Sequence, residues 1–247
     1  MNIASYLDST YLKTPDQSGL TQEQTMDVVL ALAEEAMQHD LFAVMIRPEY
    51  VKQVKEYLVS KSSNVQVGTV IGFHEGDYSI EQKLEEAKKA IEDGADELDF
   101  VINYNEYKKG NVELVSREFI EGSKLALGKN KIVKWIIEIA ALTSTQIAEI
   151  TALLSSLAEA HFSKEERGHI FVKSSTGFFK TLNGEPNGAT VEGIKLMKEN
   201  AGDLPIKAAG GVRSTQDAKE MIELGVTRIG TSSALALLEG KKGEAGY

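Results

Sequence analysis

The stretch Phe171-Val172-Lys173-Ser174-Ser175-Thr176-Gly177 places a lysine inside a short apolar run that is typical of a buried strand. The stretch Pro205-Ile206-Lys207-Ala208-Ala209-Gly210-Gly211 repeats this arrangement further along the chain. An ammonium group inside a strand loses its water, so it needs either a partner or a lower pKa. Two such groups on neighbouring strands indicate amine chemistry, because burial and a second cation together lower a lysine pKa enough for the neutral amine to attack a carbonyl.

Similar apolar, β-branched runs alternate with segments of helical period along the whole chain. We expect eight strands, at approximately residues 3–8, 42–47, 65–73, 97–103, 132–140, 169–176, 205–211 and 227–233. Helices are expected at residues 22–39, 80–93, 112–127, 144–160, 190–200 and 214–224. This repeat predicts an α/β fold of the (β/α)₈ TIM-barrel type, with residues 1–247 forming one catalytic domain. An open doubly wound sheet is the alternative, although no Gly-rich dinucleotide loop follows the first run.

The composition is that of an ordinary globular chain, with 247 residues, 42% of them hydrophobic and 26% charged. No stretch reaches membrane-spanning length, and residues 1–8 lack the regions of a secretory signal, so we expect a cytoplasmic protein. There are no cysteines and the four histidines are scattered, which argues against thiol catalysis and a metal site. A net charge of −10 without a basic cluster argues against nucleic acids and anionic membranes as partners.

Other polar residues interrupt the predicted strands, and catalytic groups of such barrels lie at the carboxyl ends of strands. Asp8 ends the first run and Asp99 lies in the fourth. Lys134 and Glu138 lie in the fifth, where equal parity predicts that both can face the same side. Each also has a structural interpretation: Asp99 as a hydrogen-bond acceptor, and Lys134 as half of a buried ion pair with Asp99 or Glu138. Lys173 and Lys207, in the sixth and seventh runs, are harder to explain as members of structural ion pairs. Asp99 and Glu138 offer too few carboxylate partners for them once one is assigned to Lys134.

The last two loops predict a phosphate site. Gly210-Gly211-Val212-Arg213 closes the seventh run, and Gly230-Thr231-Ser232-Ser233 closes the eighth just before a short helix expected near Ala234. Barrels often bind phosphate at this place, through loop amides and an additional helix. Glycines let the backbone approach an anion, and serine hydroxyls add hydrogen-bond donors.

These motifs together resemble deoxyribose-phosphate aldolase, a family of class I aldolases with a (β/α)₈ barrel. The resemblance covers essentially the whole chain and is strongest at residues 94–99, 171–177, 207–213 and 230–233. It implies the reversible cleavage of 2-deoxyribose 5-phosphate to glyceraldehyde 3-phosphate and acetaldehyde, as in deoxynucleoside catabolism. It also implies that no metal and no organic cofactor takes part.

The resemblance assigns roles to individual residues. Lys173 matches the Schiff-base lysine, Lys207 the neighbouring lysine that perturbs it, and Asp99 an acid/base partner that works through water. The other matches are the substrate-binding residues Asp8, Lys134 and Thr176, the phosphate-binding residues Gly177, Gly210, Gly211, Ser232 and Ser233, and Tyr247, a terminal tyrosine that assists proton transfer from a flexible tail at about residues 240–247.

One departure and two alternative functions accompany this resemblance. Phe178 stands where some relatives have a lysine near the phosphate, so amides or Lys180 would complete the phosphate site. The alternatives are another lysine-dependent phosphosugar aldolase or transaldolase, and a barrel that binds phosphosugars without catalysis. A homodimer is a further expectation, with a helix face such as residues 51–58 as a candidate contact.

Overall fold

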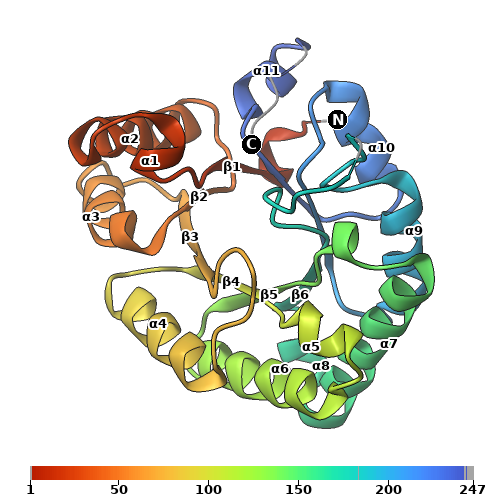
Figure 1. The fold of residues 1–247 in the computed structure, drawn as a ribbon. Helices are drawn as coiled ribbons and strands as arrows, with labels where there is room; N and C mark the ends of the chain where they lie inside the picture. Colours follow the sequence, from red (N-terminus) through yellow and green to blue (C-terminus); the bar gives the residue numbers. More distant parts are fainter. Residues whose placement is uncertain (1, 183, 242, 244–247) are drawn as a thin grey trace.

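The computed structural model is a closed barrel of eight parallel strands in sequence order (Figure 1), and it describes residues 2–182, 184–241 and 243. The strands are β1 (Leu7–Tyr11), β2 (Ala43–Ile46), β3 (Gln66–Ile71), β4 (Glu97–Val101), β5 (Ile132–Ile136), β6 (Ile170–Lys173), β7 (Ile206–Ala209) and β8 (Arg228–Thr231). β1 pairs with both β2 and β8, which closes the ring. The predicted barrel is therefore confirmed and the open sheet is excluded.

Helices surround the barrel, six of them at the positions that the sequence analysis gives as ranges. They are α1 (Pro15–Ser18), α2 (Gln22–Gln38), α3 (Val51–Ser60), α4 (Ile80–Glu92), α5 (Tyr104–Lys108), α6 (Val112–Leu127), α7 (Ser144–His161), α8 (Lys164–Arg167), α9 (Val191–Asn200), α10 (Thr215–Glu223) and α11 (Ala234–Leu238). Three 3₁₀ turns accompany them: η1 (Ala4–Tyr6), η2 (Pro48–Tyr50) and η3 (Ile139–Ala141). Local capping explains the boundaries. Before α10, for example, the Ser214 hydroxyl accepts from the Asp217 amide while the Asp217 carboxylate accepts from the Ser214 amide.

The strands are shorter than the apolar runs predict, and this changes two expectations. Because η1 occupies the start of the first run, Asp8 is the second residue of β1 and not its end. β5 stops at Ile136, and Glu138 has a left-handed backbone with φ 56°. Strand alternation therefore does not extend from Lys134 to Glu138, and the parity argument that linked them is wrong.

The main hydrophobic core lies between the barrel and the helices. Trp135 of β5 stacks on Phe100 of β4 with 4.8 Å between ring centroids, and its Nε1 donates to Ser123 of α6 at 2.9 Å. α6 comes this close because Gly122 has no side chain: a Cβ there would lie 2.8 Å from the Trp135 ring. A single large aromatic residue thus joins the barrel wall to its helix layer.

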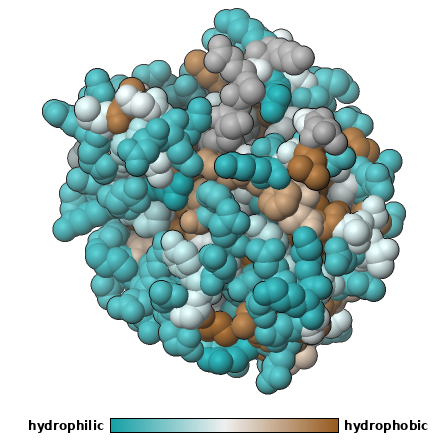
Figure 2. All heavy atoms as spheres, viewed as in Figure 1, coloured by the Kyte–Doolittle hydropathy of each residue, from teal (hydrophilic) through white to brown (hydrophobic). Residues whose placement is uncertain are grey.

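The apolar side of α3 also belongs to this core. Val51, Val54 and Leu58 are buried, so this side of the helix contacts the barrel and is not the exposed dimer surface that the sequence suggested. The end of the barrel seen in Figure 2 is mostly hydrophilic, with hydrophobic residues scattered among polar ones. No helix in the described part of the chain combines the length and hydropathy needed to span a bilayer.

Candidate active site

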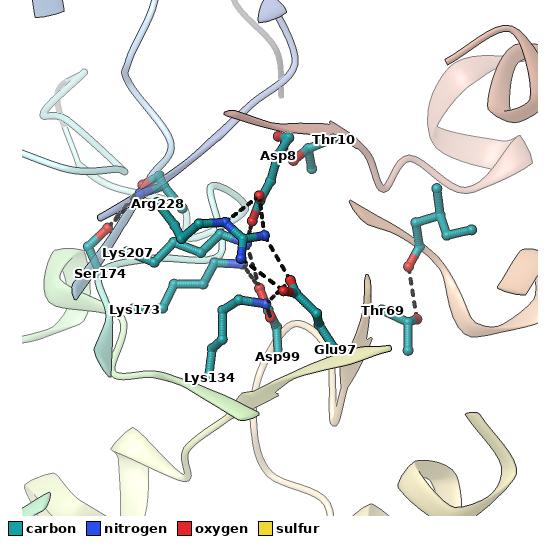
Figure 3. Close-up of polar contacts among 12 residues, drawn as sticks. Asp8, Thr10, Thr69, Glu97, Asp99, Lys134, Lys173, Ser174, Lys207 and Arg228 are labelled. Carbon is teal, nitrogen blue, oxygen red and sulfur yellow. Dashed lines mark hydrogen bonds and ion pairs between the residues drawn. The ribbon is translucent and has the colours of Figure 1, made fainter. Parts of the chain in front are cut away.

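Seven charged side chains meet inside the barrel, and we call them the ion cluster. They extend from six different strands toward one another (Figure 3), and each is at most 4% exposed. The members are Asp8, Glu97, Asp99, Lys134, Lys173, Lys207 and Arg228. Burying so many charges is tolerable only because they pair with one another.

Asp99 is the centre of the ion cluster. Its Oδ1 accepts from Lys134 Nζ at 2.7 Å, and its Oδ2 accepts from Lys173 Nζ at 2.8 Å and from Lys207 Nζ at 2.9 Å. Because both of the last two amines bond one oxygen atom, their nitrogens are close neighbours. The expectation that Lys173 and Lys207 lie side by side is confirmed.

Glu97 and Arg228 were not predicted as members of the cluster. Arg228 bridges two strands: its Nε donates to Asp8 at 2.9 Å and its Nη1 to Glu97 at 2.8 Å, while Lys134 Nζ donates to Glu97 at 2.6 Å. The sequence count of acceptors was too low because it omitted Glu97. One signal was available, since Glu97 and Asp99 share parity on β4 and so face the same side.

The ion cluster holds four cationic groups and three carboxylates, and its surroundings favour the neutral form of Lys173. Burial lowers the pKa of Lys173 to about 8, with Asp99 opposing this shift and Lys207 adding to it. Burial also disfavours the charge on Lys134, but Asp99 and Glu97 raise its pKa overall. Lys207 therefore assists the shift at Lys173, whereas burial is its main cause.

Asp99 and Asp8 remain ionised in this environment. Burial alone would raise the pKa of Asp99, but Lys134, Lys173 and Lys207 lower it well below its usual range. The pKa of Asp8 is also lowered, because Arg228 and Lys207 outweigh its burial. Asp99 thus lacks the near-neutral pKa that suits the acid/base role implied by the resemblance. Asp8 is enclosed by its ion pairs, including one of 2.6 Å to Lys207.

Thr176 lies beyond the end of β6 and is fixed by Glu138. The Thr176 amide donates to Glu138 Oε2 at 3.1 Å, and the Thr176 hydroxyl bonds the same oxygen. The Phe178 amide in turn donates to the Thr176 hydroxyl oxygen at 3.0 Å. Glu138 therefore pairs with this loop and not with Lys134, which resolves the alternative that the sequence left open.

The predicted phosphate residues lie together around a small cavity of about 30 Å³. It is lined by Gly177, Asn187, Gly210, Gly211, Val212, Arg213, Gly230, Thr231, Ser232 and Ser233. Gly210 has φ 73°, and a Cβ on Gly188 would lie 2.3 Å from the Gly210 carbonyl carbon. The loop after β6 thus packs backbone against backbone on the end of β7, which only glycines permit.

Phe178 lies in an aromatic group and is not one of the residues lining this cavity. Its ring packs edge-on against Phe73 at 5.1 Å and stacks on His74 at 5.6 Å between centroids. Phe178 therefore packs on the loop after β3. The described residues offer no group of three or more His, Cys, Asp or Glu side chains suited to a metal ion.

Tyr247 lies outside the described residues, as does most of the predicted tail. Gly243 is described, and its amide donates to the Arg213 carbonyl oxygen at 2.7 Å. A Cβ on Gly243 would also lie 2.2 Å from the Ser233 hydroxyl oxygen. The chain therefore passes the rim of the cavity at Gly243.

Comparison with known proteins links this site to an enzyme family. The family model described as DeoC/LacD family aldolase matches residues 4–240. The deoxyribose-phosphate aldolase of Thermococcus gammatolerans is 41% identical over 98% of this chain and 97% of its own length. That of Caldicellulosiruptor saccharolyticus is 42% identical over 96% of both chains. A solved tetrameric deoxyribose phosphate aldolase from Aeropyrum pernix superposes with a TM-score of 0.76, at 29% identity over 96% of this chain and 89% of that one.

Proposed function

Because this chain belongs to the DeoC/LacD family of aldolases, we propose that it cleaves 2-deoxyribose 5-phosphate to glyceraldehyde 3-phosphate and acetaldehyde through an imine on Lys173. It is an enzyme of the lyase class that breaks a carbon–carbon bond. One observation carries the choice of nucleophile: the Lys173 amine is buried, its pKa is lowered to about 8, and it shares the Asp99 carboxylate with Lys207. A lysine of this kind is neutral often enough near pH 7 to attack an aldehyde.

The cycle begins when neutral Lys173 attacks C1 of the open-chain sugar. Loss of water from the carbinolamine gives a protonated imine. The C2–C3 bond then breaks, its electron pair moves toward the imine nitrogen to give an enamine, and the C3 hydroxyl loses its proton to become the aldehyde of glyceraldehyde 3-phosphate. Protonation of the enamine at C2 and addition of water release acetaldehyde and restore the amine.

The other site residues support this chemistry in different ways. We assign Lys207 and Lys134 to the electrostatic control of Lys173, with Asp99 as the anion that holds all three amines. This electrostatic role stands beside the acid/base role through water that the resemblance implies for Asp99. Thr176 is assigned to the sugar, and Asp8 positions Lys207 through their ion pair.

The cavity between the ends of β7 and β8 is assigned to the phosphate. Gly177, Gly210 and Gly211 expose backbone there, and Ser232 and Ser233 add hydroxyl donors. Tyr247 remains a proposed aid to proton transfer. Gly243 supports this proposal because the chain already contacts the cavity rim at that residue.

We further propose that the enzyme is cytoplasmic, acts on small phosphorylated sugars and acetaldehyde, and needs no metal or organic cofactor. The proposal includes self-association as a homodimer or a larger homo-oligomer. The tetramer of the Aeropyrum pernix relative supports association of this kind.

Borohydride reduction in the presence of acetaldehyde, followed by mass spectrometry of the peptides, tests the function. We expect a stable two-carbon adduct on Lys173 that Lys173→Ala removes. An adduct formed with dihydroxyacetone phosphate but not with acetaldehyde would indicate a different aldolase. The absence of any adduct would indicate a barrel that only binds its ligand.

A further inference from the structure

Glu138 is a buried carboxyl group close to Lys173 that the assignments above do not use. Its side chain is fully buried. Oε2 accepts from the Thr176 amide and hydroxyl, whereas Oε1 has no hydrogen-bond partner in the described part of the structure. A buried carboxyl oxygen without a partner is unfavourable, so such an atom in a well-packed site calls for an explanation.

The backbone places Glu138 beside the end of β6. The Ile137 amide donates to the Lys173 carbonyl oxygen at 3.0 Å, and the Ile139 amide donates to the Ser174 carbonyl oxygen at 2.9 Å. Glu138 lies between these two bonds, just beyond the carboxyl end of β5. This is the end of the barrel where substrates bind. Lys173 is also near enough to lower the pKa of Glu138 by its charge.

We propose that Glu138 is a further catalytic residue, whose Oε1 removes the proton of the C3 hydroxyl as the C2–C3 bond breaks. In this step the hydroxyl O–H bond breaks and an O–H bond to Oε1 forms. The electrons of the former O–H bond make the C3 carbonyl, and those of the C2–C3 bond form the enamine. Glu138 then releases the proton to water or to C2 of the enamine. This inference depends on the proposed function, because it concerns the same imine.

The electrostatic surroundings suit Glu138 to this task better than Asp99. Burial raises the pKa of Glu138 to about 7, against the opposing effects of the Thr176 hydrogen bonds and of Lys173, and Glu75 raises it further. The titratable groups that face Glu138 are Lys173 from β6, Glu75 from the segment after β3, and Tyr104 from α5. A base with a pKa near the working pH transfers protons most efficiently.

Glu138 also has a possible structural role, which is to hold Thr176 and, through it, Phe178. The substitution Glu138→Gln separates the two roles. A glutamine oxygen still accepts from the Thr176 amide and hydroxyl, so the loop is retained. An amide cannot take the C3 proton, so catalysis is lost.

The test combines turnover, adduct trapping and pH dependence. We expect Glu138→Gln to lower kcat for cleavage by about 100-fold or more, while the borohydride adduct of acetaldehyde still forms on Lys173. In the unaltered enzyme kcat/KM should rise with pH through two ionisations, those of Glu138 and Lys173. The logarithmic slope should therefore approach about 2 in acid and fall to about 1 in Glu138→Gln.

Glu75→Gln is the matched control, since it removes a neighbouring carboxylate without touching Glu138. Because Glu75 raises the pKa of Glu138, the loss of the Glu75 charge should move the ionisation of Glu138 to more acidic pH. The logarithmic slope of kcat/KM against pH should stay at about 2 in acid.

Three results would overturn the assignment: near-normal cleavage by Glu138→Gln, a single ionisation in the unaltered enzyme, or loss of the adduct in Glu138→Gln. The last would show that the residue acts before bond cleavage. Failure of the unaltered enzyme to form the adduct would instead refute the proposed function.

Discussion

Two buried lysines, Lys83 and Lys173, show what separates a structural amine from a reactive one. Lys83 of α4 is 1% exposed and Lys173 is 4% exposed, and burial lowers the pKa of both. Lys83 Nζ donates to the Gly76 and Val101 carbonyl oxygens, each at 2.7 Å, and to the Glu118 carboxylate. All three of its hydrogens are therefore used.

Lys173 lacks such a complete set of acceptors among the described residues. Its hydrogen bond is to Asp99 Oδ2, an oxygen that Lys207 also uses, while Lys134 bonds the other oxygen of this carboxylate. Lys83 has a carboxylate of its own and joins the loop after β3 to the end of β4. Burial alone therefore does not make a lysine a nucleophile. The amine must also share its carboxylate with other cations and have too few hydrogen-bond acceptors, as Lys173 does among the described residues at the carboxyl end of the barrel.

The largest effect is expected from Lys173→Ala. Cleavage should fall by on the order of 10⁴-fold or more, because the covalent nucleophile is gone. Thermal unfolding should change little, since the ion cluster then holds three cations and three carboxylates. Steady-state kinetics and a melting curve measure the two properties, and substantial remaining turnover would contradict the assignment.

Lys83→Met should have the opposite effect, lowering the stability of the protein while leaving the reactivity of Lys173 unchanged. It leaves the Glu118 charge buried without its partner, so the free energy of unfolding should fall by about 3–5 kcal/mol. The adduct on Lys173 should still form in the folded fraction. Adding Glu118→Gln should restore part of the stability, because the buried charge is then removed. Denaturant unfolding of both variants measures these changes. Unchanged stability of Lys83→Met would contradict the structural role assigned to Lys83.

Lys207→Leu is expected to have an intermediate effect on activity. The Lys207 charge lowers the pKa of Lys173, so its removal should raise that pKa and reduce the neutral fraction. Each unit of increase reduces that fraction about tenfold, and we expect a loss of about tenfold near neutral pH, because burial remains the main cause of the lowered pKa. Raising the pH should recover part of the adduct formation in this variant. If high pH gives no recovery, Lys207 acts in some other way.

The smallest effect concerns pH in the unaltered enzyme. The rate of adduct formation should rise about tenfold per pH unit below about pH 8 and level off above it, since it follows the neutral form of Lys173. Timed borohydride quenching with peptide mass spectrometry measures this and shows whether Lys83 stays unmodified. A midpoint near the usual lysine pKa would show that burial does not activate Lys173.

Much of the fold was predictable because apolar runs and helical periods alternate without interruption. The six helices predicted as ranges were located to within a residue at each end, since caps such as Ser214 and Asp217 are local signals. The short helices α1, α5 and α8 were not predicted. Strand ends were less predictable. Glu138 adopts a left-handed backbone inside a run that is otherwise apolar, and no local pattern indicates this.

The candidate site was predictable where a charge interrupts an apolar run, as at Lys173 and Lys207. Glu97 and Arg228 were missed because each begins its strand next to polar residues, where a charge is unremarkable. Their partners are also far away in sequence: Arg228 meets Asp8 only because β8 pairs with β1. Contacts of this kind depend on barrel closure and cannot be derived from local patterns.

The charge balance of the ion cluster has a consequence for the covalent intermediate. With a neutral Lys173 the enclosed charges cancel, but the protonated imine adds a positive charge that has no carboxylate of its own. In surroundings of low polarity this surplus repels Lys207 and Lys134. Carbon–carbon cleavage converts the iminium into an uncharged enamine and so relieves the repulsion. The neighbours that let the amine react thus also destabilise the iminium relative to the enamine, which favours carbon–carbon cleavage.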